Sequence, residues 1–268
     1  MPNGEGKPVL VDLEEPVDQE LLSTRNGANN AYWLFTRQNR HNSQVLVNGN
    51  ANSVRNSNYR ANRPLFVVVH GWDSSGHSDM NPLITSAILD VQDANVIVVD
   101  WHRLAAAPYG TATAGVPSVG QFLGNFLTWL INTAGGNWNQ VHLIGFSLGA
   151  HVVGNAGRQV ITVRIRWTYV ECIHTDGARL GIRTPSGHAD FYPNGGRASQ
   201  PGCGALGNIC SHGRAPEFFA ATVPILVNFG DANCQTIYSN GFSMTTLSDM
   251  EKLVENKTKQ RDQYGIHM

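Results

Sequence analysis

The feature that most constrains the fold is an apolar run that leads into a serine flanked by glycines. Residues 141–149 read Val-His-Leu-Ile-Gly-Phe-Ser-Leu-Gly. They fit the G-x-S-x-G pattern, in which a buried strand turns sharply into a helix with a nucleophilic serine at the apex. The serine backbone is strained there, and side chains in place of Gly145 and Gly149 would collide with the adjoining strand and helix. We therefore predict a nucleophilic elbow at Ser147, followed by a helix over 150–160.

Strand-like and helix-like segments alternate along the chain. Four runs have strand character, and two of them, the second and third, are rich in β-branched residues, as expected for strands buried on both faces: 31–36, 65–70, 95–100 and 167–174. Helical features, namely an early proline in one case and one apolar face in the other, mark two further runs: 81–91 and 118–132. The Gly- and Pro-rich stretch 176–215 is predicted to form surface loops. This alternation predicts an α/β fold with a mostly parallel central sheet and helices on both faces.

Composition limits the class of protein. The chain has 268 residues, of which 41% are hydrophobic and 15% charged, which suits a single domain over 1–268 with a polar lead-in over 1–30. The tail over 243–268 is polar and is predicted to be disordered. The net charge of −1 and the lack of a basic block argue against nucleic acid as a partner and against steering to anionic membranes. No apolar stretch approaches the roughly 18 residues of a spanning helix, and no signal peptide is visible at the start.

Two of the four cysteines have a spacing that suggests a bond. Cys203 and Cys210 bracket a short loop in a Gly-rich segment, and such a spacing can close a small disulfide ring in an oxidising compartment. Cys172 lies in an apolar run and is predicted to be a buried thiol. Cys234 has no evident partner in the sequence.

The serine needs a base, because its hydroxyl is a poor nucleophile until its proton is taken. In this kind of hydrolase the acid and then the histidine follow the serine along the chain. His151 falls within the elbow helix and His174 within a strand, so both are interpreted as structural. His188 and His212 are predicted to lie on loops. We favour His212 as the base because the possible disulfide adjoins it and a helix over 216–222 is predicted to follow.

The reaction also needs two donors for the oxyanion. One is expected to be the backbone N–H of Leu148, directly after the nucleophile. The second should come from the loop that follows an earlier strand. Gly71 ends the first valine-rich strand and allows close backbone approach, so the N–H of Trp72 is our candidate.

Several motifs together resemble the animal pancreatic-lipase family, and its insect members in particular. They cover most of the chain up to about residue 223: 67–72, 98–101, 145–151, 173–177, 187–196, 201–203 and 210–212. The resemblance implies an α/β-hydrolase fold, secretion and hydrolysis of lipid esters. It also implies that Ser147 is the nucleophile, that His212 is the base, and that the backbones of Trp72 and Leu148 form the oxyanion hole.

One departure from the family concerns the acid. The family segment that carries the usual catalytic Asp is missing between the elbow helix and the 167–174 strand, together with positions of calcium ligands, so no metal and no cofactor is assigned on the basis of the resemblance. Three other aspartates are candidates. Asp100 precedes the serine, which breaks the chain order, and Asp190 lies in a motif that looks structural. We hypothesise that Asp176, at the end of the next strand, orients His212.

The substrate class follows from the resemblance. The stretch between Cys203 and Cys210 resembles a short form of the family lid, which favours phospholipase A1 over acylglycerol lipase activity. A catalytically impaired member that binds lipid or serves as a yolk-type storage protein is the alternative, since the usual Asp segment is missing. A gene product that lost this segment by misassembly is a further alternative. The sequence gives no indication of the oligomeric state.

Overall fold

The computed structural model describes residues 1, 3, 7–161, 171–177, 179–185, 189–204 and 207–227. The chain divides into two compact units, Met1–Trp167 and Thr168–Met268. Each unit is described by itself, and the single-domain organisation stays a prediction. No described helix is long and apolar enough to cross a membrane.

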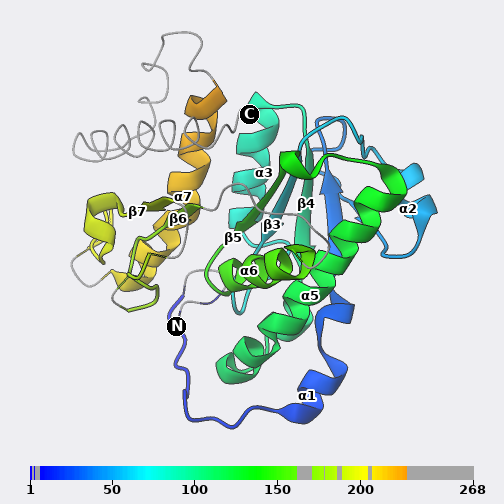
Figure 1. The fold of residues 1–268 in the computed structure, drawn as a ribbon. Helices are drawn as coiled ribbons and strands as arrows, with labels where there is room; N and C mark the ends of the chain where they lie inside the picture. The colour runs from blue at the N-terminus through cyan, green and yellow to red at the C-terminus, as the bar shows by residue number, and fades with distance from the viewer. Residues whose placement is uncertain are drawn as a thin grey trace. The chain divides into compact units, whose positions relative to one another are not determined.

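The first unit is built on a five-stranded sheet (Figure 1). Its strand order is β2-β1-β4-β3-β5. The central strand β3 pairs in parallel with β4 and with β5, whereas β1 runs antiparallel to both β4 and β2. The bounds are β1 Ala31–Phe35, β2 Gln44–Leu46, β3 Leu65–Val69, β4 Asn95–Asp100 and β5 Val141–Gly145. The strands predicted over 31–36, 65–70 and 95–100 are thus confirmed.

Strand β3 is buried along its whole length, which explains its unbroken run of apolar residues. Its side chains alternate between the two faces of the sheet. Leu65, Val67 and Val69 join the core cluster that also contains residues of α5 and α6. Phe66 and Val68 point to the opposite face, and α3 contacts β3 from outside that cluster. Both faces of the sheet are therefore covered.

Helices of the first unit agree in part with the sequence-based expectations. The helix α3 (Met80–Val91) begins within one residue of its predicted start, and α6 (Leu148–Ile161) directly follows the elbow. The helix α5 (Tyr109–Ala134) begins nine residues before the predicted start and continues through Pro117. The shorter helices are α1 Gln19–Thr24, α2 Ala51–Arg55 and α4 His102–Ala105, with 3₁₀ turns at Gly27–Asn29 and Trp138–Gln140.

The second unit contains a parallel pair of short strands and a long helix. Its elements are β6 Glu171–Ile173, β7 Ala189–Phe191, a 3₁₀ turn at Pro193–Gly196 and α7 Asn208–Val227. The disulfide between Cys203 and Cys210 is present, with Cα atoms 5.7 Å apart, as the spacing suggested. The prediction of loops over 176–215 is wrong at β7 and at the start of α7. Their pairing and packing override a local composition rich in Gly and Pro.

Candidate active site

Ser147 occupies a tight turn between β5 and α6. Its φ angle is +55°, in the left-handed region that is costly for any residue with a side chain, by about 1–3 kcal/mol. The surrounding backbone holds the turn: Gly149 N–H donates to Phe146 O at 2.8 Å, and Phe146 N–H donates to Val69 O at 3.1 Å. The elbow geometry predicted from the sequence is therefore present.

The two glycines of the elbow are required by close backbone packing. A Cβ at Gly145 would overlap the carbonyl oxygen of Gly149, and a Cβ at Gly149 would overlap that of Val69. Both obstacles are backbone atoms, which cannot move aside as the end of a flexible side chain can. The collision with the neighbouring strand and helix that the sequence suggested is confirmed.

The loop after β3 lies directly beside the serine. A Cβ added to Gly71 would stand 3.0 Å from Ser147 Cβ and 3.6 Å from Ser147 Oγ. Residue 71 therefore brings its backbone against the candidate nucleophile, and the next peptide N–H belongs to Trp72. The Trp72 indole donates from Nε1 to Ala107 O at 2.8 Å, and its ring packs edge-on against Tyr109. These contacts fix the loop.

Two backbone donors near the serine are unused. Within the part of the chain that the structure describes, the N–H groups of Trp72 and Leu148 donate no hydrogen bond. Leu148 is the first residue of α6, where N–H groups have no intrahelical partner, and Trp72 follows Gly71, whose backbone lies against Ser147. Donors of this kind can stabilise negative charge that develops on a carbonyl oxygen.

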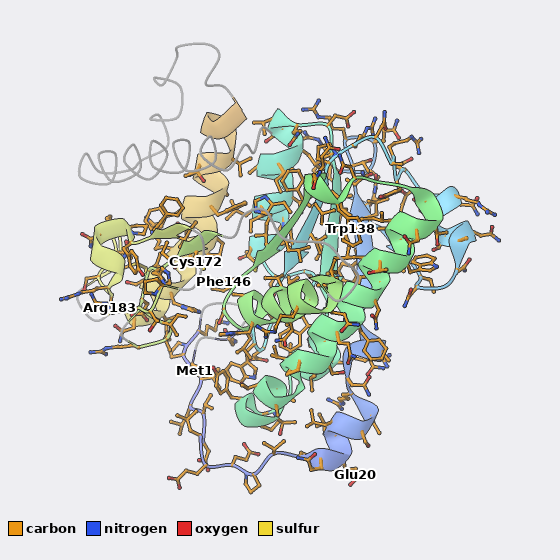
Figure 2. The ribbon with its side chains drawn as sticks, in the orientation of Figure 1. Met1, Glu20, Trp138, Phe146, Cys172 and Arg183 are labelled. Atoms are coloured by element: carbon orange, nitrogen blue, oxygen red, sulfur yellow. A yellow bond between two sulfur atoms is a disulfide. The ribbon has the colours of Figure 1, made fainter. Side chains whose placement is uncertain are left out.

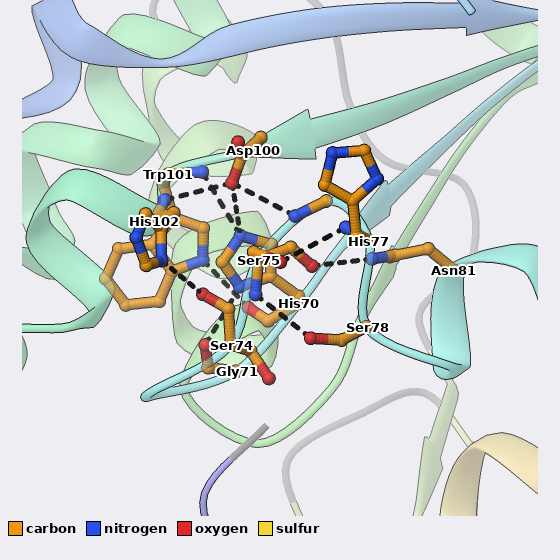
Figure 3. A network of polar contacts seen from close by, with 11 residues as sticks. His70, Gly71, Ser74, Ser75, His77, Ser78, Asn81, Asp100, Trp101 and His102 are labelled. Atoms are coloured by element: carbon orange, nitrogen blue, oxygen red, sulfur yellow. Dashed lines mark hydrogen bonds and ion pairs between the residues drawn. The ribbon is translucent and has the colours of Figure 1, made fainter. Parts of the chain in front are cut away.

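A buried histidine supports this loop, and sequence reasoning missed it. His70 is fully buried; its Nδ1 lies 2.9 Å from Gly71 O and its Nε2 lies 3.2 Å from Asp100 Oδ1 (Figure 3). The indole of Trp101 donates to His70 O at 2.8 Å. The available signal was that His70 and Asp100 follow or end two neighbouring parallel strands, so their side chains meet at one sheet edge.

Asp100 takes part in this network through several hydrogen bonds. Its Oδ1 also accepts hydrogen bonds from the backbone N–H groups of Gly76 and His102, at 3.0 and 3.1 Å. Burial opposes its ionisation, but the hydrogen bond from His70 and those from the two backbone groups outweigh it and hold the pKa of the carboxyl below its usual value. Asp100 thus holds the His70 loop.

The second unit contains His212, the candidate base. The prediction that it lies on a loop is wrong, because it lies in the second turn of α7, two residues after the disulfide. Its side chain is buried, and burial lowers the pKa of its imidazole to about 4. Thr175 Oγ1 donates to His212 O at 3.5 Å. At neutral pH the ring is therefore uncharged, as a proton acceptor must be.

Asp176, the candidate acid, is buried in the same unit, with 1% of its surface exposed. Its Oδ2 accepts from Leu180 N–H at 3.3 Å, while its Oδ1 has no hydrogen-bond partner. Burial raises the pKa of the carboxyl, although the Leu180 N–H and the charge of Arg179 oppose this. No hydrogen bond joins the carboxylate to the His212 ring within the described residues.

The remaining candidates have structural surroundings or lie outside the described residues. Asp190 pairs with His174, which follows β6 rather than lying inside it, and His151 is exposed on α6. His188 is outside the described residues. Cys172 is only partly buried, whereas a buried thiol was predicted.

Comparisons with known proteins identify a family and several relatives. The family model described as Lipase matches residues 3–168 and 164–238. The chain is 29% identical to pancreatic triacylglycerol lipase of Mus musculus over 255 residues, covering 78% of this chain and 54% of that protein. It is 31% identical to lipoprotein lipase of Bos taurus over 221 residues, covering 65% of this chain and 46% of that protein.

A third relative is described as inactive. The chain is 31% identical over 217 residues to inactive pancreatic lipase-related protein 1 of Homo sapiens, covering 70% of this chain and 45% of that protein. The chain spans about half the length of these curated relatives.

Proposed function

This chain belongs to the lipase family, which has the α/β-hydrolase fold, and on that premise we propose that it hydrolyses carboxylic esters of lipids through Ser147. The serine attacks the ester carbonyl, and the tetrahedral intermediate collapses to an acyl-enzyme as the alcohol leaves. Water then attacks the acyl group and releases the fatty acid, which restores the serine.

The observation that carries the proposal is the strained serine between two unengaged N–H groups. Ser147 is held at φ +55°, and the donors are those of Trp72 and Leu148. Donors that the fold holds in place before the reaction can stabilise an oxyanion without reorganisation, and this is the role proposed for the two N–H groups. Loss of one such donor typically costs about a hundred- to thousandfold in kcat.

His212 is proposed as the base and Asp176 as its orienting acid. The neutral His212 ring takes the serine proton, protonates the leaving alcohol and then activates water. The Oδ1 of Asp176 is buried without a hydrogen-bond partner, so a carboxylate oxygen is available to accept from an imidazolium. Both residues follow Ser147 in the chain order of an α/β-hydrolase triad.

The proposed substrates are phospholipids or acylglycerols. Only six residues separate Cys203 from Cys210, and a segment so short covers little apolar surface, which favours a phospholipase A1 activity. The disulfide supports an extracellular location, since such bonds persist in oxidising compartments.

A catalytically impaired, lipid-binding protein is the second candidate. Two observations favour it: the missing hydrogen bond between Asp176 and the His212 ring among the described residues, and the similarity to a relative described as inactive.

Hydrolysis of a short, soluble chromogenic ester by the purified chain distinguishes the two candidates. We expect turnover that disappears in Ser147→Ala and survives in Ser23→Ala, a control on the exposed face of α1. Equal rates in Ser147→Ala and the unmodified, folded chain would reject the enzyme and leave the lipid-binding candidate. Rates of hydrolysis of phosphatidylcholine and of triacylglycerol, measured next, then assign the substrate class.

A further inference from the structure

The two strands of the second unit bring three different metal-binding side chains together. In the parallel pair β6–β7, Cys172 stands opposite Asp190, and His174 follows two residues after Cys172. Alternate residues of an extended chain point to the same side. One possible ligand atom from each of these three residues lies within 4.8 Å of the other two. Figure 2 shows Cys172 at this pair of strands.

One nitrogen of the His174 imidazole is already held as it would be in a metal site. Its Nδ1 lies 2.8 Å from Ile182 O, and because a carbonyl only accepts, Nδ1 carries the proton. Nε2 faces Asp190 Oδ1 at 2.7 Å. The Tyr192 ring stacks on the imidazole at 4.5 Å with an interplanar angle of 9°. Histidine ligands in metal sites typically donate their second N–H to such a carbonyl, which fixes the tautomer and the ring orientation.

We propose that Cys172, His174 and Asp190 bind a zinc ion. Sulfur, imidazole nitrogen and one carboxylate oxygen form a ligand set that zinc accepts, whereas calcium and magnesium require mainly oxygen. On binding, the Cys172 thiol releases its proton to solvent. The proton shared between His174 Nε2 and Asp190 Oδ1 is released as well. The thiolate and the carboxylate then balance the two positive charges of the ion. A fourth tetrahedral position is left for water or another ligand.

The ion would connect β6 to β7. The segment that leaves β6 runs directly to Asp176, so zinc would also restrict the candidate acid. The site stands apart from ester hydrolysis, because none of its three ligands is assigned to that reaction. A purely structural pairing of His174 with Asp190 would make Cys172 dispensable, and this difference can be tested.

The test is metal binding by the whole chain with its disulfide intact. After removal of metals by a chelator, zinc titration should give about one ion per chain. Cobalt in place of zinc should give a thiolate-to-cobalt charge-transfer band. Cys172→Ser should abolish the band and weaken zinc binding by more than about a hundredfold, beyond the usual cost of losing only an outer-shell partner. Asp190→Asn should also weaken binding.

Matched controls are Cys234→Ser, which removes the other cysteine outside the disulfide, and His151→Ala, which removes an exposed histidine of α6. Both should bind zinc as the unmodified chain does. Absence of the cobalt band in the unmodified chain would overturn the proposal. This result does not depend on whether any variant folds. Loss of zinc binding in Cys172→Ser no greater than in His151→Ala would also overturn it.

Discussion

At the residue scale, the serine is the best-defined part of the candidate site. Ser147 sits at a positive φ angle, Gly71 lies against it, and the backbone donors of Trp72 and Leu148 are unengaged in the described part of the chain. These features depend on short segments whose sequences demand one local geometry. They were therefore predictable from the sequence.

The proposed role of Asp176 as the acid can be tested directly. We expect Asp176→Asn to lower kcat/KM by about ten-thousandfold, the loss seen in triad enzymes when the acid can no longer hold the histidine in its working tautomer. The measurement is turnover of the soluble ester at neutral pH, with near-ultraviolet circular dichroism to verify folding. Asp79→Asn, at an exposed position before α3, should retain full activity. A loss below about tenfold in Asp176→Asn would show that another group orients the base.

The buried His212 also predicts a pH-dependent stability. Its pKa is about 4 in the folded chain and about 6.5 when exposed, so the unfolded state binds more protons between these values. Stability is therefore complete above about pH 6.5 and is lost as the pH falls toward 4. We expect about 2 kcal/mol less unfolding free energy at pH 5 than at pH 7 from this residue alone.

Urea unfolding at several pH values measures this loss. His212→Gln should flatten the dependence by about that amount, whereas His151→Ala, at an exposed position, should keep it. Identical slopes in the unmodified chain and His212→Gln would show that His212 is not the group that titrates.

Residue-level prediction failed where a role depends on contacts distant in sequence. No local feature of the sequence indicates that His70 pairs with Asp100, which lies 30 residues away. His212 was predicted on a loop because it falls in the Gly- and Pro-rich stretch 176–215, where the local helix signal is weak. The observed helix α7 begins earlier, at Asn208, and burial of residues such as Phe218 and Phe219 outweighs the local preference.

At the element scale, α5 and α6 pack closely because of small residues at their contact. A Cβ at Gly120 would overlap Asn155 Cβ and Val152 O, and one at Gly124 would stand 2.8 Å from Gln159 Cβ. Small residues also explain why the start of α5 was predicted too late. The local helix signal is weakened by Gly110, Gly115 and Pro117. Gly115 is nevertheless required there, because Leu104 packs against it.

This packing predicts a sharp difference between two glycines. Gly120→Ala should destabilise the chain by about 1–3 kcal/mol, because the added methyl group forces the two helices apart. Gly154→Ala on α6 meets no atom within 4 Å and should be neutral or stabilise by up to about 1 kcal/mol, as Ala favours helix. Chemical unfolding of both variants gives the comparison, and equal stabilities would mean that the helices can separate at no cost.

At the scale of the whole molecule, the charge is almost balanced, with a net charge of −1 at pH 7. The chain has no block of basic residues, so long-range attraction to an anionic surface is weak. If the chain acts on lipid, contact must come from apolar and local polar groups. The single-domain prediction and the tail over 243–268 stay predictions at this scale.

The balanced charge predicts that turnover on phospholipid vesicles depends little on salt. Electrostatic attachment would weaken as ionic strength rises, because the Debye length shortens to about 8 Å at physiological salt. We expect nearly the same rate at low and at physiological salt, and little gain when anionic lipid is added to zwitterionic vesicles. A steep fall of the rate with added salt would contradict this and indicate a local basic contact.

The close approach of Gly71, Gly149 and Val69 around the serine also bears on how this chain can change over evolutionary time. A side chain at either glycine position meets the backbone or the serine of another segment, so no single substitution there is neutral. The obstacles are backbone atoms and the serine itself, so a second substitution elsewhere cannot relieve the collision. These positions should therefore stay glycine as the rest of the chain diverges, and libraries that vary them will contain almost no functional sequences.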